Sequence, residues 1–318
     1  MLPSKPGRLC KLVIIQPRPT MSEPTLQFVD CPDADGGHRM AYWQWGNPLA
    51  SHVVVCVHGL TRQGRDFDTL AQALCDRAGS TVRVICPDVV GRGKSDWLKN
   101  PQGYQVAYYA ADMLVLLAQL QPVTLDWLGT SMGGLIGMAV AGQPEPPAFA
   151  NIRRLVLNDV GPVIEWQALQ RIGQYLGRTG KFESEQQAAD AIWTVSSSFG
   201  PHTPAQWLAL TRPNLKPLGD GSGRLTLNYD PALALPFATV TQESAAQGEA
   251  LLWQAYDQIR ASTLLVRGAE SDLLSKATAQ AMTQRGPKAR LIEFAGVGHA
   301  PTFVATDQVQ AILSFLLD

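Results

Sequence analysis

The sequence is poor in several features, and each shortage excludes a class of protein. No uninterrupted apolar run approaches the about 18 residues that a membrane-spanning helix needs. The net charge of the 318 residues is only −1, so the chain lacks the basic character of nucleic-acid-binding proteins. Its five cysteines are an odd, scattered set without Cys-x-x-Cys spacing. We therefore expect a cytoplasmic protein without disulfides and without a nucleic-acid, membrane or metal partner.

The length and the apolar content point to a large folded core. With 318 residues, 46% of them hydrophobic, the chain is long for one ordinary domain but suits a sheet that carries an insertion. Residues 1–22 are predicted to be a disordered leader, because Lys11 interrupts the apolar stretch that a signal peptide would require. Met21 is an alternative start residue, and export is the minority alternative.

Buried-strand patterns alternate with helical patterns along most of the chain. A hairpin is predicted at residues 25–31 and 39–45, and further strands at 52–57, 82–86, 123–128, 154–157, 263–266 and 289–294. Helices are predicted at 66–78, 103–120 and 135–141. This alternation is typical of βαβ units, so we predict an α/β fold with a mostly parallel sheet that an antiparallel hairpin opens.

The alternation stops between residues 161 and 259. That stretch has helical patterns at 165–176, 184–197, 204–211 and 249–259, a Pro/Gly-rich piece at 212–223, and no strong buried-strand signal. An unstructured loop of this length is improbable in a compact domain. We therefore predict a sheet domain in two parts, 23–160 and 260–318, with a mainly helical cap inserted at 161–259.

The most informative segment is Gly129-Thr130-Ser131-Met132-Gly133, between a predicted strand and a predicted helix. A serine on such a sharp turn stands clear of the backbone, and glycines on both sides leave room for the turn. The serine still needs a base in contact to become a good nucleophile. Taken alone, the segment also fits a Gly/Ser-rich turn without chemistry.

Candidate partners for Ser131 lie in the loops after later strands. His299, flanked by small residues after the last strand, is the predicted base, because active sites of open α/β sheets lie at the carboxyl ends of strands. Asp272, after the strand at 263–266, is the predicted acid, and Asp159, after the strand at 154–157, is its competitor.

Two backbone N–H groups are expected to stabilise an oxyanion beside Ser131. Met132 supplies one at the start of its helix, and Leu60 supplies the other in the loop that begins with His58. His58 is expected to hold that loop in place. In the turn at 87–96, Asp88, Arg92 and Asp96 are expected to brace loops through ion pairs.

Five motifs together resemble the α/β-hydrolase fold, in particular its capped esterase and lipase enzymes. They are the His-Gly loop, the Pro-Asp…Gly-Arg-Gly-Lys-Ser turn, Gly-Thr-Ser-Met-Gly-Gly, Ser-Asp-Leu and Gly-His-Ala-Pro. Serine at the nucleophile position argues against the related dehalogenases and epoxide hydrolases, which have aspartate there. His-Gly-Leu-Thr-Arg and Asn-Asp-Val-Gly-Pro further resemble bacterial esterases that act on hydroxyalkanoate oligomers and polyesters.

The resemblance implies a serine carboxylesterase that needs no cofactor and acts on a small-molecule ester, with Ser131, Asp272 and His299 as its triad. Hydrolysis of a carbon–carbon or amide bond by the same triad is the alternative, and a non-catalytic binding protein is a third reading. Two or three of the cap aromatics are expected to form an apolar pocket, Trp166 and Trp253 first among Trp166, Trp193, Trp207, Trp253 and Tyr256. No oligomeric state follows from the sequence.

Overall fold

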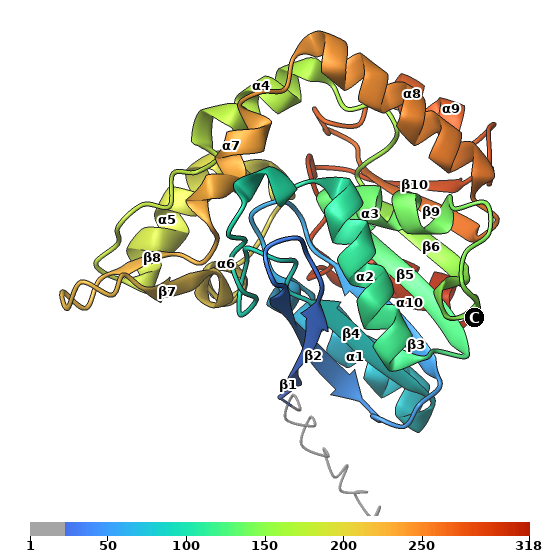
Figure 1. Cartoon of the computed structure of the whole chain (residues 1–318), viewed down its shortest axis with the longest axis horizontal. Helices are drawn as coiled ribbons and strands as arrows, with labels where there is room; N and C mark the ends of the chain where they lie inside the picture. The colour runs from blue at the N-terminus through green and yellow to red at the C-terminus, as the bar shows by residue number, and fades with distance from the viewer. Residues whose placement is uncertain (1–22) are drawn as a thin grey trace, which may run out of the picture.

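The structure is a computed structural model that describes residues 23–318, so the predicted leader at residues 1–22 lies outside the described residues. Its centre is an eight-stranded sheet in the order β1-β2-β4-β3-β5-β6-β9-β10 (Figure 1). The strands are β1 Thr25–Cys31, β2 His38–Gly46, β3 His52–Val57, β4 Val82–Pro87, β5 Thr124–Thr130, β6 Ile152–Asn158, β9 Ser262–Gly268 and β10 Arg290–Phe294. Within this sheet, β1–β2 and β2–β4 are antiparallel pairs, and the other pairs are parallel. The predicted parallel sheet with an antiparallel hairpin is confirmed.

Helices cover both faces of this sheet, as Figure 1 shows. On one face lie α2 (Val106–Leu120), α3 (Met132–Ala141) and α9 (Lys276–Met282), and on the other lie α1 (Asp68–Ala78) and α10 (Thr306–Leu317). The valine-rich strand β3 supplies both cores, because successive side chains of a strand point to opposite faces. Val53, Val55 and Val57 pack with α2 and α3, whereas Val54 and Cys56 pack with α1 and α10.

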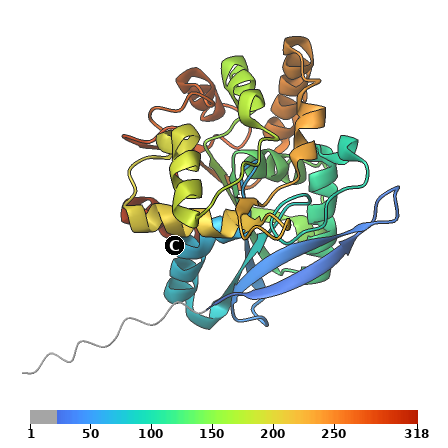
Figure 2. The same ribbon diagram turned by 90° about the vertical axis from the view of Figure 1, so that its left-hand side faces the viewer.

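The chain between β6 and β9 leaves the sheet and forms a separate layer, which Figure 2 shows facing the viewer. This insertion contains α4 Trp166–Tyr175, α5 Glu185–Ser196, α6 Pro204–Thr211, α7 Ala234–Phe237 and α8 Gln242–Gln258. It also contains a small antiparallel hairpin, β7 Leu215–Pro217 with β8 Leu225–Leu227. The predicted Pro/Gly-rich piece at 212–223 supplies β7 and the turn of this hairpin. Strands of three residues are too short to give a period-two signal.

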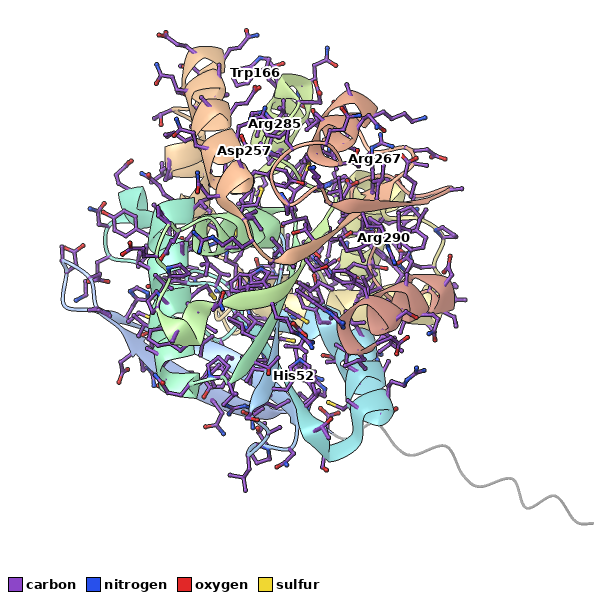
Figure 3. All side chains as sticks on the ribbon, turned by 90° about the vertical axis from the view of Figure 1, so that its right-hand side faces the viewer. His52, Trp166, Asp257, Arg267, Arg285 and Arg290 are labelled. Carbon is purple, nitrogen blue, oxygen red and sulfur yellow. The ribbon has the colours of Figure 1, made fainter. Side chains whose placement is uncertain are left out.

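The last helix of the insertion is fastened to the sheet domain. The carboxylate of Asp257, at the end of α8, forms an ion pair of 2.5 Å with Arg285, which follows α9 (Figure 3). The Arg285 guanidinium also lies over the Trp253 ring, 4.0 Å from its centroid. None of the helices in the described part of the chain is long and apolar enough to cross a membrane.

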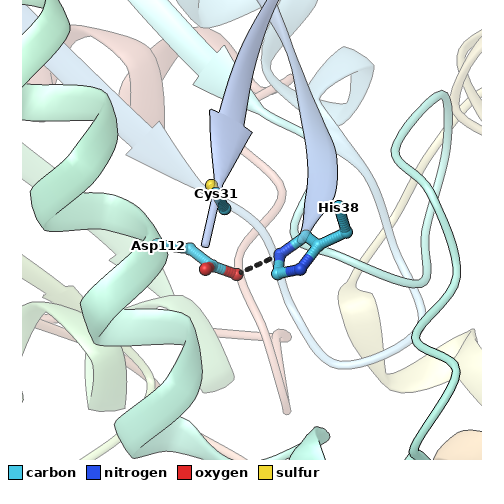
Figure 4. Close-up of side chains that lie close together, drawn as sticks. All are labelled: Cys31, His38 and Asp112. Atoms are coloured by element: carbon cyan, nitrogen blue, oxygen red, sulfur yellow. Dashed lines mark hydrogen bonds and ion pairs between the residues drawn. The ribbon is translucent and has the colours of Figure 1, made fainter. Parts of the chain in front are cut away.

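A partly buried histidine, His38, links the first hairpin to α2 (Figure 4). The His38 ring contacts Asp33 through Nδ1 at 2.8 Å and Asp112 of α2 through Nε2 at 3.0 Å. The Cys31 thiol lies beside them, within 4.8 Å of the ligating atoms of His38 and Asp112. Both ring nitrogens of His38 thus hydrogen-bond to carboxylates. Asp33, His38 and Asp112 together are called the ion trio below.

Candidate active site

Ser131 lies on the sharp turn between β5 and α3, as the sequence predicts. Its φ of 53° and ψ of −117° fall where residues with a side chain are uncommon. The glycines two residues away make this turn sterically feasible. A Cβ on Gly129 would lie 2.2 Å from the Gly133 carbonyl oxygen, and one on Gly133 would lie 2.0 Å from the Val57 carbonyl oxygen. The predicted reason for these glycines is therefore confirmed.

A line of hydrogen bonds joins Ser131 to a histidine and a carboxylate. The Ser131 Oγ lies 3.0 Å from His299 Nε2, and His299 Nδ1 lies 2.7 Å from an Asp159 carboxylate oxygen. The carboxylate fixes the imidazole tautomer that leaves Nε2 free to accept the serine proton. The three residues follow β5, β6 and β10, which are parallel strands whose carboxyl ends lie at one edge of the sheet. This arrangement can activate the hydroxyl of Ser131 for nucleophilic attack.

The prediction that Asp272 faces His299 is wrong. Asp272 forms an ion pair of 2.8 Å with Arg171, and its side chain is 51% exposed. Asp159, the competitor, is fully buried, and it also accepts hydrogen bonds from the Gly268 N–H at 2.9 Å and the Ser271 hydroxyl at 2.6 Å. The turn after β9 thus directs Ser271 inward and Asp272 outward, so that only Asp159 reaches the imidazole.

Asn158, the residue before Asp159, helps to fix the position of Asp159. The Asn158 side-chain amide donates to Thr130 Oγ1 at 3.0 Å, and to the Pro301 carbonyl oxygen at 2.8 Å. Asn158 therefore ties the end of β6 to the end of β5 and to the loop that carries His299. The signal in the sequence that could have indicated Asp159 as the acid is the pair Asn158-Asp159, directly after the predicted strand at 154–157.

The loop that carries Leu60 lies against Ser131. A Cβ on Gly59 would be only 3.8 Å from the Cβ of Ser131. His58 is buried and holds the loop: its Nδ1 donates to the Gly59 carbonyl oxygen at 2.7 Å, and its Nε2 accepts from the Val89 N–H at 2.9 Å. Burial lowers the pKa of His58 to about 3, so the ring stays neutral. The predicted structural role of His58 is confirmed.

Arg92 and Asp88 brace the same region through backbone groups. Arg92 is buried, and its Nε donates to the Leu60 carbonyl oxygen at 2.8 Å. The Asp88 carboxylate accepts from the backbone N–H groups of Gly64 and Lys94, at 2.7 and 2.8 Å. Burial raises the pKa of Asp88 to about 6, although these hydrogen bonds oppose the shift. The expected bracing is found: Asp88 and Arg92 provide it through hydrogen bonds to the backbone, whereas Asp96 forms an ion pair of 3.6 Å with Arg39, as predicted.

The N–H of Met132 is the first of α3, where a helix N–H has no partner within the helix and the dipole is positive. Together with the adjacent Leu60 loop, this helix start offers backbone N–H groups beside Ser131 that can bind a developing oxyanion.

The comparison with known families agrees with this geometry. The model of the family described as "Alpha/beta hydrolase family" matches residues 54–312. The chain belongs to this family.

Individual relatives of this α/β-hydrolase cover nearly its whole length. It is 48% identical, over 91% of its own length and 96% of the relative's, to a 3-hydroxybutyrate-oligomer hydrolase from Cupriavidus necator. An α/β hydrolase structure from Novosphingobium aromaticivorans is similar with a TM-score of 0.77 and 33% identity, over 93% of this chain and 99% of that one. A structure from Rickettsia typhi has a TM-score of 0.79 and 28% identity, over 93% and 99% of the two chains. The predicted fold and the predicted hydrolase class are confirmed.

In this α/β-hydrolase, two cavities meet at Ser131. The smaller has a volume of about 390 Å³ and is also lined by His299 and the loop that follows it. The larger, of about 780 Å³, is also lined by Met132, Leu135 and residues of α4 and α8. Leu60 and Ile172 line both cavities. An ester held with its carbonyl at Ser131 would therefore have space for one half of the molecule on each side.

Of the aromatic residues proposed for the pocket, the structure places Trp166 in the wall of the larger cavity. Trp253 lines neither of the two cavities at Ser131; its ring packs edge-on to Tyr256 at 5.7 Å and under Arg285. Trp193 and Trp207 pack edge to face, with ring centroids 4.9 Å apart, in a small core of the insertion. The prediction for Trp253 is therefore wrong, because an apolar side chain of a helix fills core more readily than it lines a pocket.

Proposed function

We propose that this protein is a serine carboxylesterase, and that Ser131, His299 and Asp159 carry its chemistry. Ser131 Oγ attacks the ester carbonyl while His299 Nε2 takes the hydroxyl proton, and Asp159 stabilises the imidazolium. The N–H groups of Leu60 and Met132 stabilise the oxyanion. His299 then returns the proton to the leaving alkoxide, and an acyl-enzyme on Ser131 remains.

Water resolves the acyl-enzyme by the same steps in reverse order. His299 takes a proton from water, hydroxide adds to the acyl carbon, and the collapse of the tetrahedral intermediate releases the acid and restores the Ser131 hydroxyl. The observation that carries the proposal is the continuous hydrogen-bond line from Asp159 through His299 to Ser131, at the point where two cavities meet.

We further propose that residues 161–259 act as a cap that shapes the substrate site. In support, residues of α4, α5 and α8 line the two cavities on the side opposite the sheet. Such a cover excludes water from the reacting bond and supplies apolar walls.

The substrate class that we propose is linear oligomers of 3-hydroxybutyrate and related hydroxyalkanoates. The 48% identity to a 3-hydroxybutyrate-oligomer hydrolase over nearly the full chain supports this choice. The cavities support it too, because an oligomer needs room on both sides of the ester that is cleaved.

Purified enzyme tests the proposal against a panel of 3-hydroxybutyrate dimers and trimers, p-nitrophenyl esters of graded chain length, vinylogous diketones and polyester emulsions. We expect turnover of the oligomers and the aliphatic esters. Ser131→Ala should lower turnover by about 10⁶-fold, because it removes the nucleophile, and it should leave the fold intact. Retention of more than a few per cent of activity by Ser131→Ala would refute the assignment of the nucleophile.

A further inference from the structure

The walls of the two cavities at Ser131 differ in charge. Three arginines, Arg62, Arg171 and Arg178, line the smaller cavity, with Asp66 as its acidic residue. The larger cavity is lined by two acidic residues, Glu165 and Glu249, and by no lysine or arginine. The smaller cavity is therefore suited to an anionic group, and the larger one disfavours it.

Two of the arginines already have carboxylate partners. Arg62 binds Asp66 with Nε and Nη2, at 2.6 and 2.7 Å. Arg171 binds Asp272 with Nε and Nη2, at 2.8 and 3.0 Å.

Arg178 differs from them. Within residues 23–318, the Arg178 guanidinium has no carboxylate and no hydrogen-bond partner, although it lines the same cavity as Ser131. A guanidinium presents a planar fork of donors that matches a carboxylate, so a free one in a substrate cavity is a ready site for this group.

The position of His299 indicates which half of the ester each cavity would hold. His299 lines the smaller cavity and not the larger one. The group that returns the proton must lie beside the leaving oxygen, so the alcohol half of the ester belongs in the smaller cavity. The acyl half then belongs in the larger cavity, whose walls are mainly apolar and whose charged residues are Glu165 and Glu249.

The two ends of a hydroxy-acid oligomer differ in charge, as the two cavities do. On the alcohol side of any of its ester bonds, the chain ends in a free carboxylate, and on the acyl side it ends in a free hydroxyl. We propose that Arg178 binds the free carboxylate of the oligomer in the smaller cavity, so that the enzyme cleaves close to the carboxyl end. This inference rests on the proposed function and adds a binding residue and a direction of cleavage to it.

The test compares three forms of one 3-hydroxybutyrate trimer: the free acid, the carboxyl methyl ester and the O-acetyl derivative of the terminal hydroxyl. For the unmodified enzyme, we expect methylation of the carboxylate to raise KM about three- to tenfold, the effect of losing one partly exposed charged contact. Acetylation of the hydroxyl should have a smaller effect, because it removes no charge and changes the end of the trimer that lies in the larger cavity, away from Arg178.

In Arg178→Gln the free acid and the methyl ester should have equal KM, and in Arg178→Lys part of the difference should return. The matched control is Lys181→Gln, which removes an exposed cation three positions away that lines neither cavity; it should keep the full difference. Because the readout is a ratio of substrates within one variant, a general loss of activity does not imitate it.

Equal KM for the two trimers in the unmodified enzyme, or an undiminished difference in Arg178→Gln, would overturn the inference while the esterase assignment stood. If the enzyme hydrolyses p-nitrophenyl esters but none of the trimers, the proposed substrate class is wrong, and the inference about Arg178 is wrong with it.

Discussion

In the proposed mechanism, the reactivity of Ser131 depends on the carboxylate of Asp159, which solvent does not reach. Asp159 accepts hydrogen bonds from a backbone N–H and a serine hydroxyl besides the imidazole of His299. These donors keep the carboxylate in one orientation, so the imidazole is held in one tautomer. The geometry of the site thus depends on the three groups that hydrogen-bond to the Asp159 carboxylate.

This arrangement predicts opposite outcomes for two isosteric substitutions. Asp159→Asn should lower kcat by up to about 10⁴-fold, because an amide favours the wrong imidazole tautomer. Asp272→Asn should leave kcat within about twofold of the unmodified enzyme, because its exposed ion pair with Arg171 contributes little.

Steady-state kinetics on p-nitrophenyl butyrate measures both variants, and thermal unfolding shows that each is folded. A larger loss in Asp272→Asn than in Asp159→Asn would mean that the carboxylate after β9 replaces Asp159 when substrate is bound.

At the scale of elements, α4 connects the insertion to the chemistry. It begins at Trp166, whose side chain lines the larger cavity, and it also carries Ile172, which lines both cavities. The helix is the first element that follows β6 and Asp159. A change on α4 is therefore expected to alter which substrates fit, without altering the reactive groups.

Two tryptophans of the insertion form a matched pair that tests this expectation. Trp166→Ala should enlarge the larger cavity and shift the preference a few-fold toward longer acyl chains. Trp253→Ala should leave the chain-length profile unchanged and should lower the free energy of unfolding by about 2 kcal/mol, because it removes packing against Tyr256 and Arg285.

A series of p-nitrophenyl esters from acetate to decanoate gives the chain-length profile, and urea denaturation gives the stability. An unchanged profile in Trp166→Ala, or a changed one in Trp253→Ala, would contradict the assignment of the cavity wall.

At the scale of the whole molecule, the ion trio of Asp33, His38 and Asp112 couples the first hairpin to α2, and so to the rest of the sheet. The side chains of His38 and Asp112 are each 7% exposed. Burial alone would lower the pKa of His38, but the hydrogen bonds to Asp112 and Asp33 outweigh it and raise the pKa to about 9. The hydrogen bond from His38 is also the main reason that the pKa of Asp33 is lowered to about 2.

The raised pKa of His38 makes stability depend on pH. A folded-state pKa above the unfolded value of 6.5 means that the trio stabilises the fold fully below pH about 6.5, and that this contribution is lost as pH rises through about 9. The loss is on the order of 3 kcal/mol at most.

Urea denaturation at pH 6.5, 8 and 9.5 measures the effect, with His38→Gln as the reference protein. We expect the difference in stability between the two proteins to shrink as pH rises. A constant difference over this range would show that His38 is neutral in the folded protein.

Local patterns in the sequence predict the central sheet, most of the helices and the pairing of Ser131 with His299. Strand β3 is predicted with its observed bounds, and the Gly-x-Ser-x-Gly turn and the loop Gly298-His299 predict a nucleophile and a base whose side chains lie 3.0 Å apart in the structure. These features are local: the alternation of side chains, the room that a missing Cβ leaves, and a loop at a strand end are all written within a few residues. Sequence reasoning therefore reached the family, and it singled out two of the three side chains that the structure joins by hydrogen bonds.

Local patterns do not distinguish Asp159 from Asp272, or Trp166 from Trp253, whereas contacts between distant segments do. Both aspartates follow strands of the same sheet, so the local pattern treats them alike. The choice depends on β6 lying next to β5, and on a turn that points Ser271 inward and Asp272 into solvent. Likewise, both tryptophans lie on helices of the insertion, and only the packing of α8 against Arg285 removes Trp253 from the cavity. Direction of a side chain across a fold is a property of contacts between distant segments, which no short stretch of sequence contains.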